Sequence, residues 1–134
     1  MSYALQDVKN QIMGCWNILK EIKSLNEAIL ETSIEQDKII NILLGIQELY
    51  QTKFEKLERM FNQNILDKEC EEYMLDCWQI VDDIYLIAEY MNDEMVEIIQ
   101  RDNISNLLMG LESLYELKFK KLWKNYTTFI VNNS

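Results

Sequence analysis

The stretch LYQTKFEKL at positions 49–57 returns, little changed, as LYELKFKKL at positions 114–122. The match extends upstream, because residues 41–57 and 106–122 align at an offset of 65 with nine identities in seventeen positions. A second pair of segments, CWNILKEI at 15–22 and CWQIVDDI at 77–84, aligns at an offset of 62. The chain therefore contains one two-segment unit twice, with three extra residues between the segments of the second copy.

Each of the four segments carries apolar side chains at intervals of three and four residues, the spacing that places them on one face of a helix. The first copy has Leu5, Val8, Ile12, Cys15, Leu19 and Ile22, then Leu43, Ile46, Tyr50, Phe54, Leu57 and Phe61. The second has Cys70, Tyr73, Cys77, Ile80, Ile84, Ile87 and Met91, then Leu108, Leu111, Tyr115, Phe119, Leu122 and Tyr126. The chain has no proline and three glycines, as expected of a helical protein. We predict an all-α protein with helices over about 3–30, 34–63, 67–91 and 94–127.

The short connections between these helices predict antiparallel neighbours and an up-down-up-down four-helix bundle. One amphipathic hairpin cannot bury its apolar face alone, whereas two similar hairpins can bury theirs against each other. We therefore predict one domain, 1–134, made of hairpins 3–63 and 67–127 around a pseudo-twofold axis, with a short flexible tail at 128–134. The repeated aromatic residues are predicted to form matched core layers: Tyr50, Phe54, Tyr115 and Phe119.

Two further expectations concern local structure and the thiols. Ser33 followed by Gln36 is the pattern of a capping box and predicts the start of the second helix. The three cysteines, Cys15, Cys70 and Cys77, are an odd number in a chain without an apparent export signal. We therefore expect reduced, buried thiols rather than disulfides.

The sequence shows no signal peptide and no membrane anchor. Its first ten residues lack a basic stretch followed by an apolar one, and its longest apolar runs are about five residues, whereas a spanning helix needs roughly twenty. We expect a soluble, cytoplasmic protein that is not secreted and does not bind membranes.

Composition excludes several kinds of active site. The chain has no histidine, so serine–histidine and cysteine–histidine nucleophiles and histidine metal sites are absent. Acids one turn apart at Glu55 and Glu58, and at Glu69 and Glu72, leave an Mg²⁺-dependent all-α nucleotide pyrophosphohydrolase as an alternative. Glu55 points away from the apolar stripe, however, and its repeat counterpart is Lys120. We expect no enzymatic activity, no cofactor and no metal.

The net charge of −10 is concentrated in one part of the chain. Residues 67–97 hold eleven acids and one lysine, whereas residues 1–66 have a net charge of −2 and residues 98–134 a net charge of +2. Lysines 118–124 are expected beside the start of the third helix, so the unbalanced charge should lie toward its end. The predicted interaction patch is Glu72, Asp76, Asp82, Asp83, Glu89, Asp93, Glu94 and Glu97.

This charge distribution favours a non-enzymatic protein–protein interaction module. A sharper form of this hypothesis is a small acidic inhibitor, of the kind that viruses or mobile elements make, that engages a basic surface of nucleic-acid-handling machinery. Direct nucleic-acid binding is not expected, because phosphate contacts need clustered Lys and Arg. The alternative is a self-associating structural or virion component. This alternative is favoured by Trp16, Trp78 and Trp123, because a thin bundle does not readily bury so many large aromatic side chains. A homodimer is one form that such self-association could take.

Overall fold

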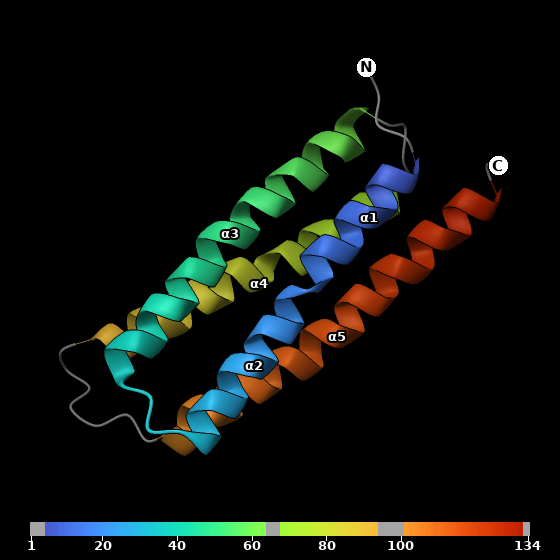
Figure 1. Ribbon diagram of the computed structural model, residues 1–134. Helices are drawn as coiled ribbons and strands as arrows, with labels where there is room; N and C mark the ends of the chain where they lie inside the picture. The colour runs from blue at the N-terminus through green and yellow to red at the C-terminus, as the bar shows by residue number, and fades with distance from the viewer. Residues whose placement is uncertain (1–4, 64–67, 94–100, 133–134) are drawn as a thin grey trace.

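The computed structural model describes residues 5–63, 68–93 and 101–132, and these form five α-helices and no strand (Figure 1). The first two helices lie end to end as one rod, so the molecule is an all-α bundle of four rods. The helices are α1 (Leu5–Trp16), α2 (Ile18–Glu31), α3 (Gln36–Gln63), α4 (Lys68–Asn92) and α5 (Arg101–Asn132).

The predicted single helix over 3–30 is wrong in one respect, because the chain divides it at Asn17. The backbone of Asn17 stays in the right-handed helical region, but its carbonyl accepts from the Lys20 N–H at 3.0 Å, a tighter i→i+3 bond. Gly14 and Asn17 both have low helix propensity, which makes this turn the weakest in the rod. The two pieces keep a common direction and one buried face.

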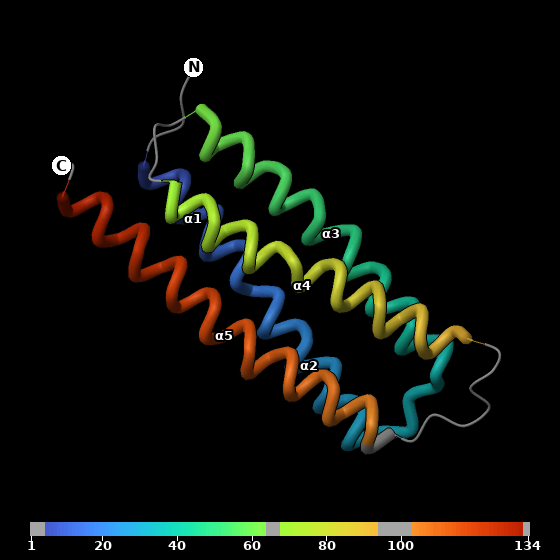
Figure 2. The backbone as a smooth tube through the Cα atoms, turned by 180° about the vertical axis from the view of Figure 1, so that it is seen from behind, coloured from blue at the N-terminus to red at the C-terminus, as the bar shows by residue number. Residues whose placement is uncertain are grey.

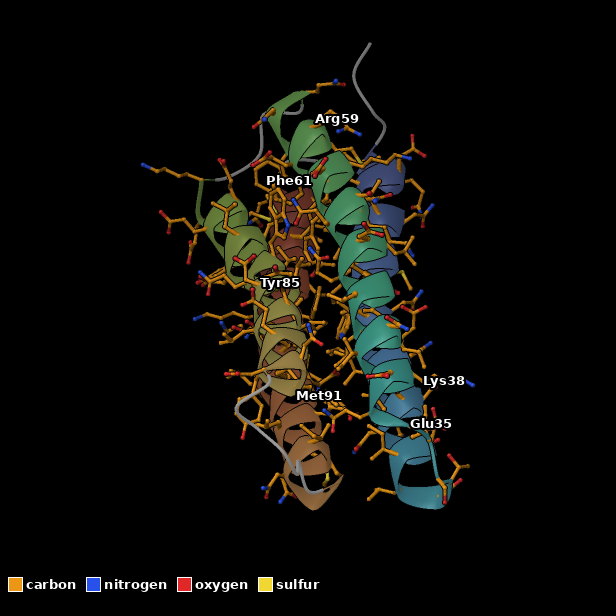
Figure 3. All side chains as sticks on the ribbon, turned by 90° about the vertical axis from the view of Figure 1, so that its left-hand side faces the viewer. Glu35, Lys38, Arg59, Phe61, Tyr85 and Met91 are labelled. Atoms are coloured by element: carbon orange, nitrogen blue, oxygen red, sulfur yellow. The ribbon has the colours of Figure 1, made fainter. Side chains whose placement is uncertain are left out.

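The junction between α2 and α3 also differs from the predicted capping box. α3 begins at Gln36, and the Gln36 side-chain amide donates to the carbonyl of Met91 at 2.7 Å instead of reaching back to Ser33. Gln36 therefore ties the start of α3 to the last turn of α4, where helix carbonyls lack intrahelical partners. Figure 3 shows this end of the bundle, with labels on Glu35, which directly precedes α3, and on Met91, in the last turn of α4.

α4 ends close to its predicted position, whereas α5 ends beyond its predicted position. α4 agrees with the predicted 67–91 to within one residue at each end. α5 continues to Asn132, so residues 128–132, expected in a flexible tail, are helical, and Ile130 still packs against the core. The predicted start of that helix at 94 lies outside the described residues.

The rods form a closed ring (Figure 2). α3 packs against α4, α4 against α5, and α5 against α2, while α1 packs against α3. The α1–α2 rod therefore lies diagonally opposite α4, and α3 lies diagonally opposite α5. This is the arrangement expected of an up-down-up-down bundle.

The core runs the length of the bundle and contains nearly all of the predicted stripe residues. Leu5 is an exception, because it is 40% exposed at the start of α1. All three cysteines are buried and free, as predicted. The buried positions of the α1–α2 rod recur in α4 62 residues later, as Val8, Ile12, Cys15, Ile18 and Ile22 correspond to Cys70, Met74, Cys77, Ile80 and Ile84.

The predicted aromatic layer is confirmed at the centre of the bundle. Tyr50, Phe54, Tyr115 and Phe119 are at most 1% exposed, and the rings of Phe54 and Phe119 meet across the diagonal with centroids 6.2 Å apart. Because these side chains come from α3 and α5, they join the two hairpins rather than stabilise either one alone.

Candidate functional site

Five of the eight acids predicted as an interaction patch are exposed, on α4 or directly after it. Glu72, Asp76, Asp82, Glu89 and Asp93 are exposed. Glu94 and Glu97 lie outside the described residues. Neither Asp82 nor Glu89 forms an ion pair with a lysine or arginine within the described part of the chain.

Asp83 differs from the exposed acids of the predicted patch because it is half-buried and accepts a hydrogen bond from the Tyr115 hydroxyl on α5. Burial, followed by this bond, raises the pKa of Tyr115 well above its ordinary value. In the first hairpin, burial and then Glu21 raise the pKa of Tyr50 in the same way. Asp83 therefore holds α4 against α5 and contributes little to a surface for a partner.

Asp82 lies about 100° around the helix axis from Asp83, in a groove between α3 and α4. This groove has a volume of about 370 Å³ and is lined by Gln51, Leu75, Trp78, Gln79 and Asp82. The Trp78 indole N–H donates to Gln51 at 3.0 Å, and its ring stacks on Phe54. The predicted patch is thus divided by the helix itself, with Asp82 on the α3 side and Asp83 on the α5 side.

Two of the four lysines predicted to lie beside the start of α4, Lys118 and Lys121, lie on the side of α5 that packs against α4, whereas Lys120 pairs with Glu116 on its own helix. The Lys121 ammonium lies 4.9 Å from the centre of the Tyr73 ring, and the Tyr73 hydroxyl donates to Glu69 at 2.7 Å. Lys118 lies in the same way over Tyr115 at 4.7 Å. These two lysines, Lys118 and Lys121, are therefore placed near the middle and the beginning of α4, respectively.

The exposed end of α4 also carries apolar side chains that the sequence reasoning missed. A groove of about 700 Å³ between α4 and α5 is lined by Leu86, Ile87, Tyr90, Asn103, Asn106 and Leu107. Leu86 is 63% exposed, and Tyr90 and Leu107 are nearly half exposed. A signal was present, because Leu86 and Tyr90 are one turn apart and fall outside the apolar stripe of their helix.

The three tryptophans are half-buried and packed against the core instead of lying free on the surface. Trp16 stacks on Phe119 with centroids 5.8 Å apart and donates its indole N–H to Glu116 at 3.0 Å. Trp123 packs against Trp16, and Lys9 lies over its outer face at 5.6 Å. The tryptophans therefore serve the packing of the bundle first.

The acids considered for a metal-dependent hydrolase do not come together in the structure. Glu55 is exposed and accepts from Gln51 on its own helix at 3.0 Å, while Glu69 accepts from Tyr73. Within the described ranges, no three His, Cys, Asp or Glu side chains are grouped closely enough to hold a metal ion. Over the same ranges, no helix has the length and apolar character needed to cross a bilayer.

Comparisons with known proteins gave no match: no family model, no curated protein and no solved structure is significantly similar to this chain.

Proposed function

We propose that this protein is a non-enzymatic protein-binding module whose α4 surface engages a cationic surface of another protein. The observation that carries the proposal is the location of the charge: residues 67–97 hold eleven acids and one lysine, and Asp82 and Glu89 face solvent without an ion pair in the described residues. Acids so placed attract a basic partner at long range and speed its association.

We also infer that the two hairpins are related by a pseudo-twofold axis, as the repeated sequence predicts. Trp16 on Phe119 and Trp78 on Phe54 are equivalent contacts under the repeat offsets, and both pairs are stacked with interplanar angles of 8°. The groove beside Trp16, about 430 Å³, is lined by counterparts of the residues beside Trp78: Met13, Asn17, Lys20 and Glu116 correspond to Leu75, Gln79, Asp82 and Gln51.

This equivalence supports a functional reading of the acids. The position of Asp82 is occupied by Lys20 in the first hairpin, and that of Asp76 by Gly14. Because the matched fold accepts a lysine or no side chain there, packing does not require the carboxylates. They are available for a role at the surface.

The sharper form of the proposal is an inhibitor that occupies a basic surface of nucleic-acid-handling machinery. α4 has 25 residues and is about 37 Å long, so its carboxylates are spread along a rod of negative charge. Such a rod competes with a phosphate backbone for the same lysines and arginines.

The test uses a charge-reversal variant, Asp76→Lys, Asp82→Lys and Glu89→Lys, which leaves Asp83 and its bond to Tyr115 intact. The matched control reverses three exposed acids outside α4: Glu27→Lys, Asp37→Lys and Glu48→Lys. Both variants change the net charge equally. Each protein is used to capture partners from an extract of the cells that make it, at several salt concentrations.

We expect wild type and the control to retain a stoichiometric partner with a basic surface, and the α4 variant to lose it. Added nucleic acid should displace that partner if the sharper proposal holds. Equal capture by all three proteins would contradict a role for the α4 acids.

A second candidate, a self-associating structural component, is favoured by the exposed leucines of α5. Leu114 is 50% exposed and Leu117 is 67% exposed, on the part of α5 that also carries the lysines. Sedimentation equilibrium over a wide concentration range decides between the candidates, because a scaffold component should form dimers or larger species without any other protein.

A further inference from the structure

The apolar groove between α4 and α5 has a matched groove in the first hairpin, and the two have different linings. The equivalent groove, between α2 and α3, is lined by Ala28, Lys38 and Ile42 among others. Under the repeat offsets these are the positions of Tyr90, Asn103 and Leu107, which line the α4–α5 groove.

The large apolar side chains of the α4–α5 groove are therefore not needed to close a hairpin of this kind. Leu86 stands where the first hairpin has Ser24, and Tyr90 stands where it has Ala28. Leaving Leu86 63% exposed and Tyr90 48% exposed costs free energy of hydration in the isolated protein. An apolar patch with no role in packing is typical of a binding surface.

The lining residues of the groove include no lysine, no arginine and no acid. Asp82 is exposed and precedes Leu86 by one helical turn, so the two side chains are neighbours on the outer face of α4. Asp83, one turn before Ile87, is engaged by its bond to Tyr115. Glu89 accepts from the Tyr85 hydroxyl on the exposed face of the same helix.

Charge complementarity selects the occupant. A second copy of this chain has a net charge of −10 and would bring carboxylates against carboxylates. A segment with lysines or arginines beside its apolar side chains meets the acids and the apolar floor together. A groove between two packed helices suits an amphipathic helix, which inserts side chains spaced three and four apart.

We propose that the α4–α5 groove binds an amphipathic, basic helical segment of the partner protein, with apolar side chains over Leu86, Tyr90 and Leu107 and with Lys or Arg beside the α4 acids. This inference rests on the proposed function and adds where the partner sits and which chemistry it presents. The apolar contacts slow dissociation, while the acids speed encounter.

The probe is a synthetic, fluorescently labelled helical peptide with leucines on one face and lysines on the other. A peptide of identical composition, with its order scrambled so that no face is apolar, is the control probe. The groove variant, Leu86→Ser with Tyr90→Ala, installs the residues that the first hairpin has at the matched positions. The control variant, Leu30→Ser with Leu49→Ala, removes two other exposed apolar side chains, 59% and 48% exposed.

We expect wild type and the control variant to bind the helical peptide more tightly than the scrambled one. The groove variant should bind the helical peptide at least about tenfold more weakly, because it loses the apolar contacts. All three proteins should unfold at similar denaturant concentrations, since the changed side chains are exposed.

The outcomes separate the two proposals. If the α4 charge-reversal variant loses the peptide but the groove variant keeps it, the groove proposal is overturned and the charge-based function stands. If the groove variant loses the peptide while the charge-reversal variant keeps it at low salt, the groove stands and the electrostatic function fails. If the helical and scrambled peptides bind wild type equally, or if the groove variant merely abolishes self-association, the proposed occupant is wrong.

Discussion

The two hairpins bury most of the same positions but expose different chemistry. Cys15 and Cys77 are both fully buried, and so are Phe54 and Phe119. At exposed positions the two hairpins differ, because Lys20 of the first hairpin corresponds to Asp82 of the second, and Ser24 corresponds to Leu86.

This difference separates residues that the fold requires from residues that it merely accepts. A position occupied by the same kind of side chain in both hairpins answers a packing requirement shared by both. A position where one hairpin has a lysine or a small residue and the other has an acid or a leucine is free of that requirement. The second hairpin presents the acidic and apolar surface, so the proposed function is assigned to this half of the molecule.

Truncation of the central phenylalanines should produce the largest loss of stability. Phe54→Ala and Phe119→Ala should each lower the free energy of unfolding by about 3–5 kcal/mol, since both rings are fully buried and each leaves a cavity against a stacked tryptophan. Urea denaturation of each variant provides the measurement.

The two losses should agree to within about 1 kcal/mol if the environments are equivalent, and the double variant should not be additive, because the two rings touch. A difference of several kcal/mol between the single variants would break the comparison of the hairpins.

The matched thiols should make the protein less stable in alkali. Burial raises the pKa of Cys15 from 9.0 to about 12, and burial likewise raises the pKa of Cys77. The stability that the two protonated thiols contribute to the folded protein is complete below pH 9. It is lost as the pH rises toward the folded-state pKa, because the thiols of the unfolded chain ionise first. The free energy of unfolding should fall by a slope approaching about 1.4 kcal/mol per pH unit for each thiol.

Denaturant titrations between pH 8 and pH 10.5 check this slope, because the ordinary thiol pKa of 9.0 lies within this interval. Cys15→Ala and Cys77→Ala should each make it shallower by a similar amount, whatever they do to stability at neutral pH. An unchanged slope in either variant would show that its thiol is not shielded from water, and that the two sites are not equivalent.

Most of the fold could be predicted because it depends on residues that repeat. Apolar spacing identified the buried faces, and the matched phrases around Phe54 and Phe119 identified the central layer. The error at the start of α3 came from a side chain that bonds to a tertiary partner instead of a nearby one. Gln36 bonds to Met91 rather than to the start of its own helix, and no short-range pattern reveals that choice.

The candidate site was harder to predict because its acids are all alike in the sequence. Asp82 and Asp83 are neighbours in the chain, yet one lines a groove beside Trp78 and the other bonds to Tyr115. Helical geometry separates their directions by about 100°, but the identity of the facing residue depends on how the helices pack. The apolar groove was not predicted because the patch was defined by charge alone, although Leu86 lies outside the buried stripe of its helix.

The smallest expected effect concerns a buried polar residue found in one hairpin alone. Asn26 is 7% exposed, and its side-chain carbonyl is buried without a hydrogen-bond partner in the described structure. The matched position in the second hairpin is Ala88, which is buried in the same way. An unsatisfied buried carbonyl costs about 1–3 kcal/mol, part of which is offset by the packing of the larger side chain.

Asn26→Ala should therefore raise the free energy of unfolding by about 1 kcal/mol. Ala88→Asn should lower it by more, because this change adds both a polar group and volume to a packed core. Urea titrations of the two variants measure both changes. If Asn26→Ala is instead destabilising by more than about 1 kcal/mol, the amide makes an interaction that the fold needs, and the first hairpin contains a structural requirement that the second does not share.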